Sequence, residues 1–303
     1  MSAGLSRALT RSRVPGLILT LLSITQYCSF DTSPARAAEQ FGTLPYERHV
    51  IQWQHGPLRF YTAGNSAGPL LIFIHGSPGG WGDWLPYLTN PALAETYWLA
   101  ALDRPGYGGS QRGAAQGQLA VQAQAVHAMV RQMRSRQLND NHTAASPLVL
   151  VGHSYGGPVV IRYAMDYPAE LQSMVLLASP ADPALEEWTW LNQFADSIPG
   201  NFLLPVDWLT SNTELKPLRS ELDEVSIRYA ALHLPVLILQ GTSDRLVPAA
   251  NADYLEKKLQ HLASGSLQIK RLPAIDHFFI WSEQQLVLQE LQQFLKNSNA
   301  FHP

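Results

Sequence analysis

The chain has 303 residues, of which 46% are hydrophobic and 15% are charged, and its formal net charge is −3. This composition is typical of a globular chain with a large core, built as one α/β domain or as one domain with an insertion. It excludes a largely disordered chain, and it offers no basic face for nucleic acid.

The first 38 residues differ from the rest of the chain. Three arginines precede a largely apolar stretch, residues 14–30, and the small residues Ala35 and Ala37 follow it. This order is typical of a secretory signal peptide, cleaved after Ala37 or after Ala38. An uncleaved membrane anchor is the alternative, but a proline and several polar residues make the stretch a poor spanning helix. We therefore expect an exported protein, periplasmic or secreted, with no stable membrane insertion once residues 1–38 are removed.

The only cysteine, Cys28, lies inside this segment. Cleavage would leave a mature chain without thiols, so we expect no disulfide, no zinc–cysteine site and no cysteine nucleophile. The histidines show no clustered ligand spacing, and the serine motif described below is not a phosphate-binding loop. We therefore expect neither a metal nor an organic cofactor.

The pattern of apolar residues predicts a sheet of about eight strands. Two alternating segments, 50–54 and 58–61, flank a turn and indicate an antiparallel opening. The runs that follow are continuously apolar, as is typical of parallel strands covered by helices on both faces. These strands are expected at 70–74, 98–102, 148–151, 174–177 and 236–239, with a last one at 267–272.

Segments with helical periodicity lie between these runs, as at 119–133, and a final helix is expected at 282–296. Strands that alternate with helices predict an α/β fold with a doubly wound, mostly parallel sheet.

The interval between the strands at 174–177 and 236–239 is far longer than one crossover helix requires. We interpret residues 181–233 as an inserted, mainly helical cap, and residues 39–180 and 234–303 as the core domain. Two roles are open for the large apolar residues of the cap, which are Trp188, Trp190, Phe194, Phe202, Leu203, Leu204 and Trp208. They line a pocket for an apolar substrate, or most of them pack the cap onto the core, which we favour.

A serine framed by glycines follows the strand at 148–151. The sequence Gly152-His153-Ser154-Tyr155-Gly156 has the Gly-x-Ser-x-Gly spacing of a nucleophile elbow. In such a turn the serine adopts a strained backbone conformation, and strand and helix approach so closely that glycine is needed at the flanking positions. We predict that Ser154 is a catalytic nucleophile and that the helix after it ends near Tyr167.

The loops after the other strands supply further candidates, because ligands of open α/β sheets bind outside the carboxyl ends of the strands. The loop at 75–80 has glycines that allow an exposed backbone N–H. We expect the N–H groups of Ser77 and of Tyr155, the residue after the nucleophile, to form an oxyanion hole. Asp103 and Arg104 follow the next strand, and we interpret them as structural, ion-pairing residues.

An aspartate and a histidine complete the candidate catalytic residues. Asp244 lies in a loop bounded by glycine and proline after the strand at 236–239, where a carboxylate can orient a histidine and stabilise its protonated form. His277 follows the last strand. Asp276 precedes His277 directly and is poorly placed to accept from that ring. We therefore predict Ser154, Asp244 and His277 as nucleophile, acid and base.

These motifs together resemble the α/β-hydrolase fold family, from the His75-Gly76-Ser77-Pro78 loop to His277, which is nearly the whole mature chain. The serine, acid, histidine order matches that fold. The loops at 103–108 and 241–248 also resemble the family. The His-Gly-x-Pro loop and the cap are similar to those of epoxide hydrolases and haloalkane dehalogenases, but these families use an aspartate where this chain has Ser154. Asp182 is a rival acid, because some members of the superfamily carry their acid after this strand.

The resemblance implies a serine hydrolase that acts on a small-molecule substrate, in the first place a carboxylic ester with a small or medium acyl group. An amide or amino-terminal peptide is the runner-up, with Glu186, Glu187 and Asp196 of the cap as candidates to receive an ammonium group; a solvated acidic face explains them as well. Carbon–carbon bond hydrolases and cofactor-free haloperoxidases have related folds. A non-catalytic binding protein on this fold also stays open, since fold does not fix function.

Overall fold

The computed structural model describes residues 42, 44–139 and 146–297. The expected signal peptide at 1–38 lies outside these residues and stays a prediction, as does the export that depends on it. Within the described ranges, no helix is both long and apolar enough to cross a membrane.

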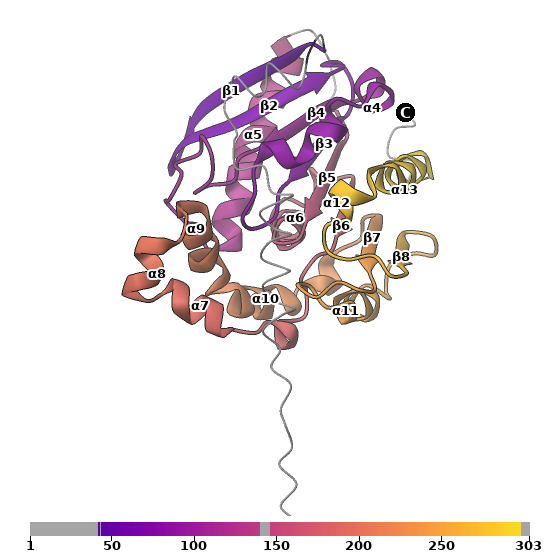
Figure 1. Ribbon diagram of the computed structural model, residues 1–303. Coiled ribbons are helices and arrows are strands. Elements are labelled where there is room, and N and C mark those ends of the chain that lie inside the picture. The colour runs from indigo at the N-terminus through magenta and orange to yellow at the C-terminus, as the bar shows by residue number, and fades with distance from the viewer. Residues whose placement is uncertain (1–41, 43, 140–145, 298–303) are drawn as a thin grey trace, which may run out of the picture.

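One eight-stranded sheet forms the centre of the molecule, with the strand order β1-β2-β4-β3-β5-β6-β7-β8 (Figure 1). The strands are β1 (Tyr46–Trp53), β2 (Gly56–Gly64), β3 (Leu70–Ile74), β4 (Trp98–Leu102), β5 (Leu148–His153), β6 (Ser173–Leu177), β7 (Val236–Gly241) and β8 (Leu267–Leu272). The pairs β1–β2 and β2–β4 are antiparallel, and all other neighbouring strands are parallel. The predicted doubly wound, mostly parallel sheet of eight strands is therefore confirmed.

The inner strands are mostly apolar because both of their faces are covered. Every residue of β3, β4, β5, β6 and β7 is buried. Successive side chains point to opposite faces, so Ile72 and Leu150 join the core on one side of the sheet, and Phe73 and Val151 join the core on the other.

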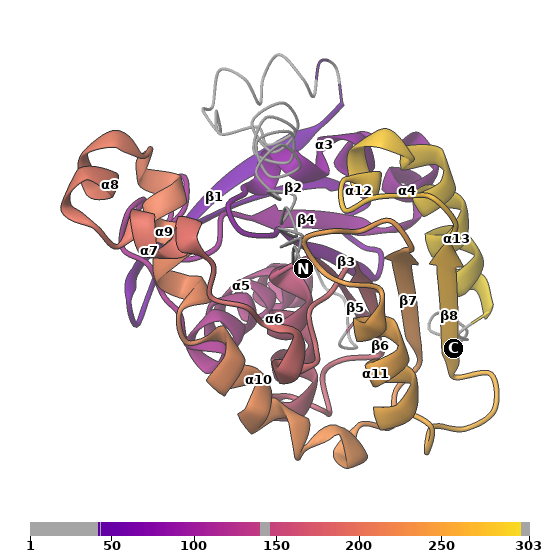
Figure 2. The same cartoon turned by 60° about the horizontal axis from the view of Figure 1, so that its bottom comes forward.

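Helices cover both faces of the sheet (Figure 2). One core is closed by α5 (Leu119–Asn139), α6 (Gly156–Asp166), α10 (Leu218–Ser226) and α11 (Ala250–Lys258). The other is closed by η1 (Trp81–Trp84), α3 (Leu85–Leu88), α4 (Pro91–Thr96), α12 (Phe279–Ser282) and α13 (Gln284–Asn297). The helix after Ser154 ends at Asp166 with Tyr167 as its C-cap, as predicted. The final helix predicted at 282–296 is observed as α13, and the short α12 directly precedes it.

Residues 178–235 connect β6 to β7 and are called the helical insertion below. Besides α10 it contains η2 (Pro183–Leu185), α7 (Trp190–Ala195), α8 (Ile198–Leu203), α9 (Val206–Leu215) and η3 (Tyr229–Ala231). In Figures 1 and 2, α7, α8 and α9 lie at the side of the molecule opposite α13. Trp190, Phe202 and Leu203 are 59%, 86% and 73% exposed, so these three of the seven large apolar residues do not have the packing role that we favoured for most of them.

Candidate active site

Ser154 occupies a sharp turn between β5 and α6. Its φ angle is +51°, in the left-handed region that few residues other than glycine adopt. A Cβ atom on Gly152 would collide with the carbonyl oxygen of Gly156, and a Cβ atom on Gly156 would collide with the carbonyl oxygen of Ile74. The backbone geometry predicted for an elbow is therefore confirmed, and the flanking glycines are there because strand, turn and neighbouring strand leave no room for a side chain.

His277 and Asp244 form a buried pair. His277 Nδ1 lies 2.7 Å from Asp244 Oδ2, while the other carboxylate oxygen accepts from the backbone N–H groups of Leu246 at 2.9 Å and Val247 at 2.8 Å. Because an ionised carboxylate only accepts, Nδ1 of His277 carries the hydrogen. The imidazole is thereby fixed in the tautomer that leaves Nε2 as the proton acceptor.

His153, the residue before Ser154, connects the serine turn to the histidine loop. Its Nε2 donates to the carbonyl oxygen of His277 at 3.1 Å, and the two ring centroids are 4.9 Å apart. Burial, with a smaller effect from His277, holds the pKa of His153 well below its usual range, so this donor stays neutral. The structure therefore brings the turn of Ser154 and the pair of His277 and Asp244 to the same edge of the sheet. This contact, between residues 124 positions apart, was not predicted from the sequence.

The two expected oxyanion donors lie beside the serine turn. A Cβ atom on Gly76 would be 3.0 Å from the Cβ atom of Ser154, so the loop that carries Ser77 contacts the serine directly. Within the described residues, the backbone N–H groups of Ser77 and Tyr155 donate to no protein acceptor. Both N–H groups are therefore unused by the fold.

The alternative acids have other partners. The Asp182 carboxylate accepts from the backbone N–H of Ala184 at 2.9 Å, where it caps η2, and Asp276 accepts from Phe278 N–H at 2.9 Å. In the part of the chain that the structure describes, neither carboxylate is hydrogen-bonded to a histidine, which favours Asp244 as the acid.

Asp103 and Arg104 are ion-paired, as predicted. Asp103 Oδ2 lies 2.6 Å from Arg59 Nη2. The buried Arg104 forms a bidentate pair with Glu214 of α9, in which Nη1 donates to Oε2 at 2.9 Å and Nη2 donates to Oε1 at 2.8 Å. The partner Glu214 was not identified from the sequence. Arg104 itself indicates that a carboxylate partner exists, because a buried guanidinium group requires a neighbouring negative charge. Nothing in the sequence singles out Glu214 among the acidic residues of the helical insertion.

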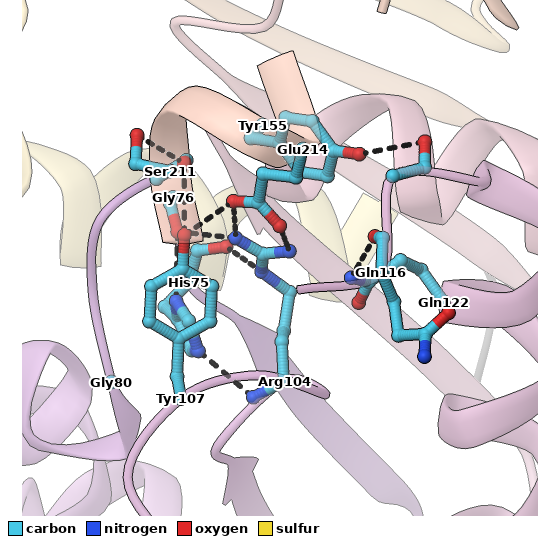
Figure 3. Close-up of polar contacts among 12 residues, drawn as sticks. His75, Gly76, Gly80, Arg104, Tyr107, Gln116, Gln122, Tyr155, Ser211 and Glu214 are labelled. Carbon is cyan, nitrogen blue, oxygen red and sulfur yellow. Dashed lines mark hydrogen bonds and ion pairs between the residues drawn. The ribbon is translucent and has the colours of Figure 1, made fainter. Parts of the chain in front are cut away.

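His75 holds the start of the oxyanion loop. Its Nε2 accepts the backbone N–H of Arg104 at 2.9 Å, and its Nδ1 donates to the carbonyl oxygen of Gly76 at 2.8 Å (Figure 3). This arrangement requires a neutral ring. Burial, together with the Arg104 charge, keeps the pKa of His75 well below its usual range. Across the described ranges, no group of three or more histidine, cysteine, aspartate or glutamate side chains is placed to hold a metal ion.

Comparison with known proteins identifies similar chains. Residues 69–212 match the family described as alpha/beta hydrolase fold. The dihydrolipoyllysine-residue acetyltransferase component of an acetoin cleaving system from Pseudomonas putida is 25% identical, over 79% of this chain and 66% of that protein. Monoacylglycerol lipase from Mycolicibacterium smegmatis is 28% identical, over 52% of this chain and 64% of that protein. The chain thus spans less than two thirds of the length of these relatives.

Among solved structures, a bacterial membrane phospholipase A superposes with a TM-score of 0.62 at 19% sequence identity. The match covers 94% of this chain and 98% of the phospholipase chain. At this level of identity, the likeness shows that the two proteins share a fold.

Proposed function

Because the chain belongs to the alpha/beta hydrolase fold family, we propose that it is a serine hydrolase that cleaves carboxylic esters with a small or medium acyl group through an acyl-enzyme intermediate. The observation that carries this proposal is the 2.7 Å contact between His277 and Asp244, at the sheet edge where Ser154 stands in its strained turn.

The first half of the reaction forms the acyl-enzyme. Ser154 Oγ attacks the carbonyl carbon of the ester, and Nε2 of His277 takes the hydroxyl proton. Asp244 stabilises the imidazolium that results. The negative oxygen of the tetrahedral intermediate accepts hydrogen bonds from the N–H groups of Ser77 and Tyr155. Collapse of the intermediate breaks the ester bond, and His277 returns the proton to the leaving alkoxide.

The second half repeats the sequence with water. His277 removes a proton from a water molecule, which attacks the carbonyl carbon of the acyl-enzyme, and the same two N–H groups hold the oxyanion. The intermediate then expels Ser154 Oγ, which recovers its proton from His277. The carboxylic acid leaves, and no cofactor takes part in either half.

Two observations support an ester substrate in preference to a peptide with a free amino terminus. Asp196 pairs with Lys216 at 2.7 Å, so this carboxylate already has a cationic partner. Burial raises the pKa of Glu186 to about 7, which makes this half-buried carboxyl a poor anion for an ammonium group at neutral pH. The names of the two relatives, a lipase and an acetyltransferase, also denote enzymes that act on acyl groups.

Steady-state hydrolysis tests the proposal. Matched p-nitrophenyl acetate, butyrate and octanoate are compared with amino-acid p-nitroanilides, on the wild type, on Ser154→Ala and on Ser179→Ala, a buried serine after β6 that serves as the control. We expect ester turnover that disappears in Ser154→Ala and persists in Ser179→Ala. Turnover that survives in Ser154→Ala, or anilides that are cleaved faster than esters, would contradict the proposal.

A further inference from the structure

We propose that Arg104 and Glu214 are positioning residues that hold residues 75–77, the oxyanion loop, in the geometry that catalysis requires. Helix α9 of the helical insertion would then be a part of the catalytic unit and not a separate cover. This inference rests on the proposed function and deepens it.

The buried side chain of Arg104 donates hydrogen bonds to the backbone of the oxyanion loop. This side chain is fully buried, and its Nε donates to the carbonyl oxygen of His75 at 2.9 Å, while Nη2 donates to the carbonyl oxygen of Gly76 at 2.7 Å (Figure 3). These two carbonyl groups immediately precede Ser77. The position of the Ser77 N–H is therefore set by where the guanidinium group lies.

Glu214 sets the position of that guanidinium group. The glutamate is also fully buried, and it accepts from Nη1 of Arg104 at 2.9 Å, from Nη2 at 2.8 Å and from the Tyr107 hydroxyl at 2.6 Å. A buried charge without a partner is strongly unfavourable, and carbonyl dipoles alone do not neutralise a guanidinium ion. Removing the charge of Glu214 therefore loosens the contacts of Arg104 with the oxyanion loop.

A second contact joins α9 to the loop. The Ser77 hydroxyl oxygen lies 2.7 Å from the hydroxyl oxygen of Ser211 on α9 and 3.1 Å from that of Tyr107. On the other side, the guanidinium carbon of Arg104 lies 4.6 Å from the ring centroid of Tyr155. Both proposed oxyanion donors, Ser77 and Tyr155, thus contact one buried network, and one end of that network is α9.

The same helix offers a matched control. Asp207 of α9 forms a two-pronged pair with Arg112 of the loop after β4, at 2.9 and 2.7 Å. This pair also ties the helical insertion to the core. Within the described residues, neither partner forms a hydrogen bond or ion pair with residues 75–77 or Tyr155, so the pair tests the attachment of α9 independently of the oxyanion loop.

The test compares Glu214→Gln with Asp207→Asn in the full chain. Hydrolysis of a p-nitrophenyl ester gives kcat and KM, and inhibition by a trifluoromethyl ketone with the same acyl chain gives Ki. The ketone forms a covalent adduct with Ser154 in which the former carbonyl oxygen is negative, so its Ki reports on the oxyanion hole.

We expect Glu214→Gln to lower kcat on the order of 30-fold with KM changed by less than about twofold. The reason is that the Ser77 N–H, which is displaced in this variant, contributes to stabilising the transition state and not to binding the substrate. Ki for the ketone should rise by a factor similar to the loss in kcat/KM. Asp207→Asn should leave all three constants within about twofold of the wild type.

Unchanged kcat and Ki in Glu214→Gln would overturn the inference, and so would an equal loss in Asp207→Asn, which would indicate a general effect of attaching α9. If circular dichroism shows that Glu214→Gln does not fold, Ser211→Ala decides, because it removes the hydroxyl contact with Ser77 and leaves no buried charge. We then expect kcat to fall about threefold at constant KM; an unchanged kcat would overturn the inference. Failure of the wild type to hydrolyse any ester would instead overturn the proposed function.

Discussion

Asp244 and His277 face each other across 2.7 Å, and the second oxygen of Asp244 is held by the N–H groups of Leu246 and Val247. The carboxylate therefore has no freedom to turn away from the imidazole. It fixes both the orientation and the tautomer of the ring.

Asp244→Asn should lower kcat on the order of 10³-fold, because an amide group does not stabilise the imidazolium and permits the wrong tautomer. Ester hydrolysis at saturating substrate measures this loss. Asp276→Asn, next to His277 in the chain but bonded to Phe278 N–H, is the control and should stay within about twofold of the wild type. A larger loss in Asp182→Asn than in Asp244→Asn would move the acid to Asp182.

The strained backbone of Ser154 predicts an unusual order of stabilities. At a φ angle of +51°, a residue with a Cβ atom is disfavoured and glycine is not. Ser154→Gly should therefore be more stable to urea than Ser154→Ala, by about 1 kcal/mol in the free energy of unfolding.

Ser173 provides the control for this comparison, because it is buried in the regular strand β6. There the order should reverse, with Ser173→Ala more stable than Ser173→Gly by about 0.5–1 kcal/mol. If Ser154→Ala were more stable than Ser154→Gly, as expected for the pair of variants at Ser173, the turn at Ser154 would carry no strain.

We expect the buried His49 to make the protein less stable in mild acid. The ring is 5% exposed in β1, and its Nε2 lies 2.8 Å from the Thr62 hydroxyl oxygen. Burial lowers the pKa of His49 to about 4, with a further lowering by Arg136 that Glu47 opposes.

The direction follows from proton binding. The unfolded chain takes up a proton on this histidine near pH 6.5, and the folded chain does so only near pH 4. The free energy of unfolding therefore falls as the pH drops through this window, by about 1.4 kcal/mol per pH unit for this one group. Urea titrations from pH 7.5 to 4.5 should give a shallower slope for His49→Gln than for the wild type, and equal slopes above pH 7. Parallel curves at all pH values would contradict the prediction.

The sheet could be predicted because its inner strands are buried on both faces. The bounds of β3 and β4 agree with the expected ones, since apolar runs of five residues between turn residues have few other structures available. The bounds of the edge strand β8 also agree, although its sequence, Leu-Gln-Ile-Lys-Arg-Leu, is only partly apolar. The short helices α3 and α4 were not predicted. Elements of four to six residues show little periodicity, and their positions depend on what they pack against.

The residues around Ser154 could be predicted for a different reason. Their chemistry is local, because each lies directly after a strand and all parallel strands end at the same edge. The partner Glu214 is 110 residues from Arg104, and its identity depends on how α9 folds back over the loop after β4. Long-range contacts of this kind leave no pattern in the sequence.

The measurement that tests the serine hydrolase proposal most directly is the intact mass of the protein after treatment with a fluorophosphonate, beside Ser154→Ala. A single phosphonyl adduct on the wild type and none on the variant is the predicted result, because only a serine activated by His277 displaces fluoride from phosphorus. Absence of an adduct on the wild type, under conditions that label a control serine hydrolase, would contradict an activated Ser154. An adduct on both proteins would place the reactive group elsewhere.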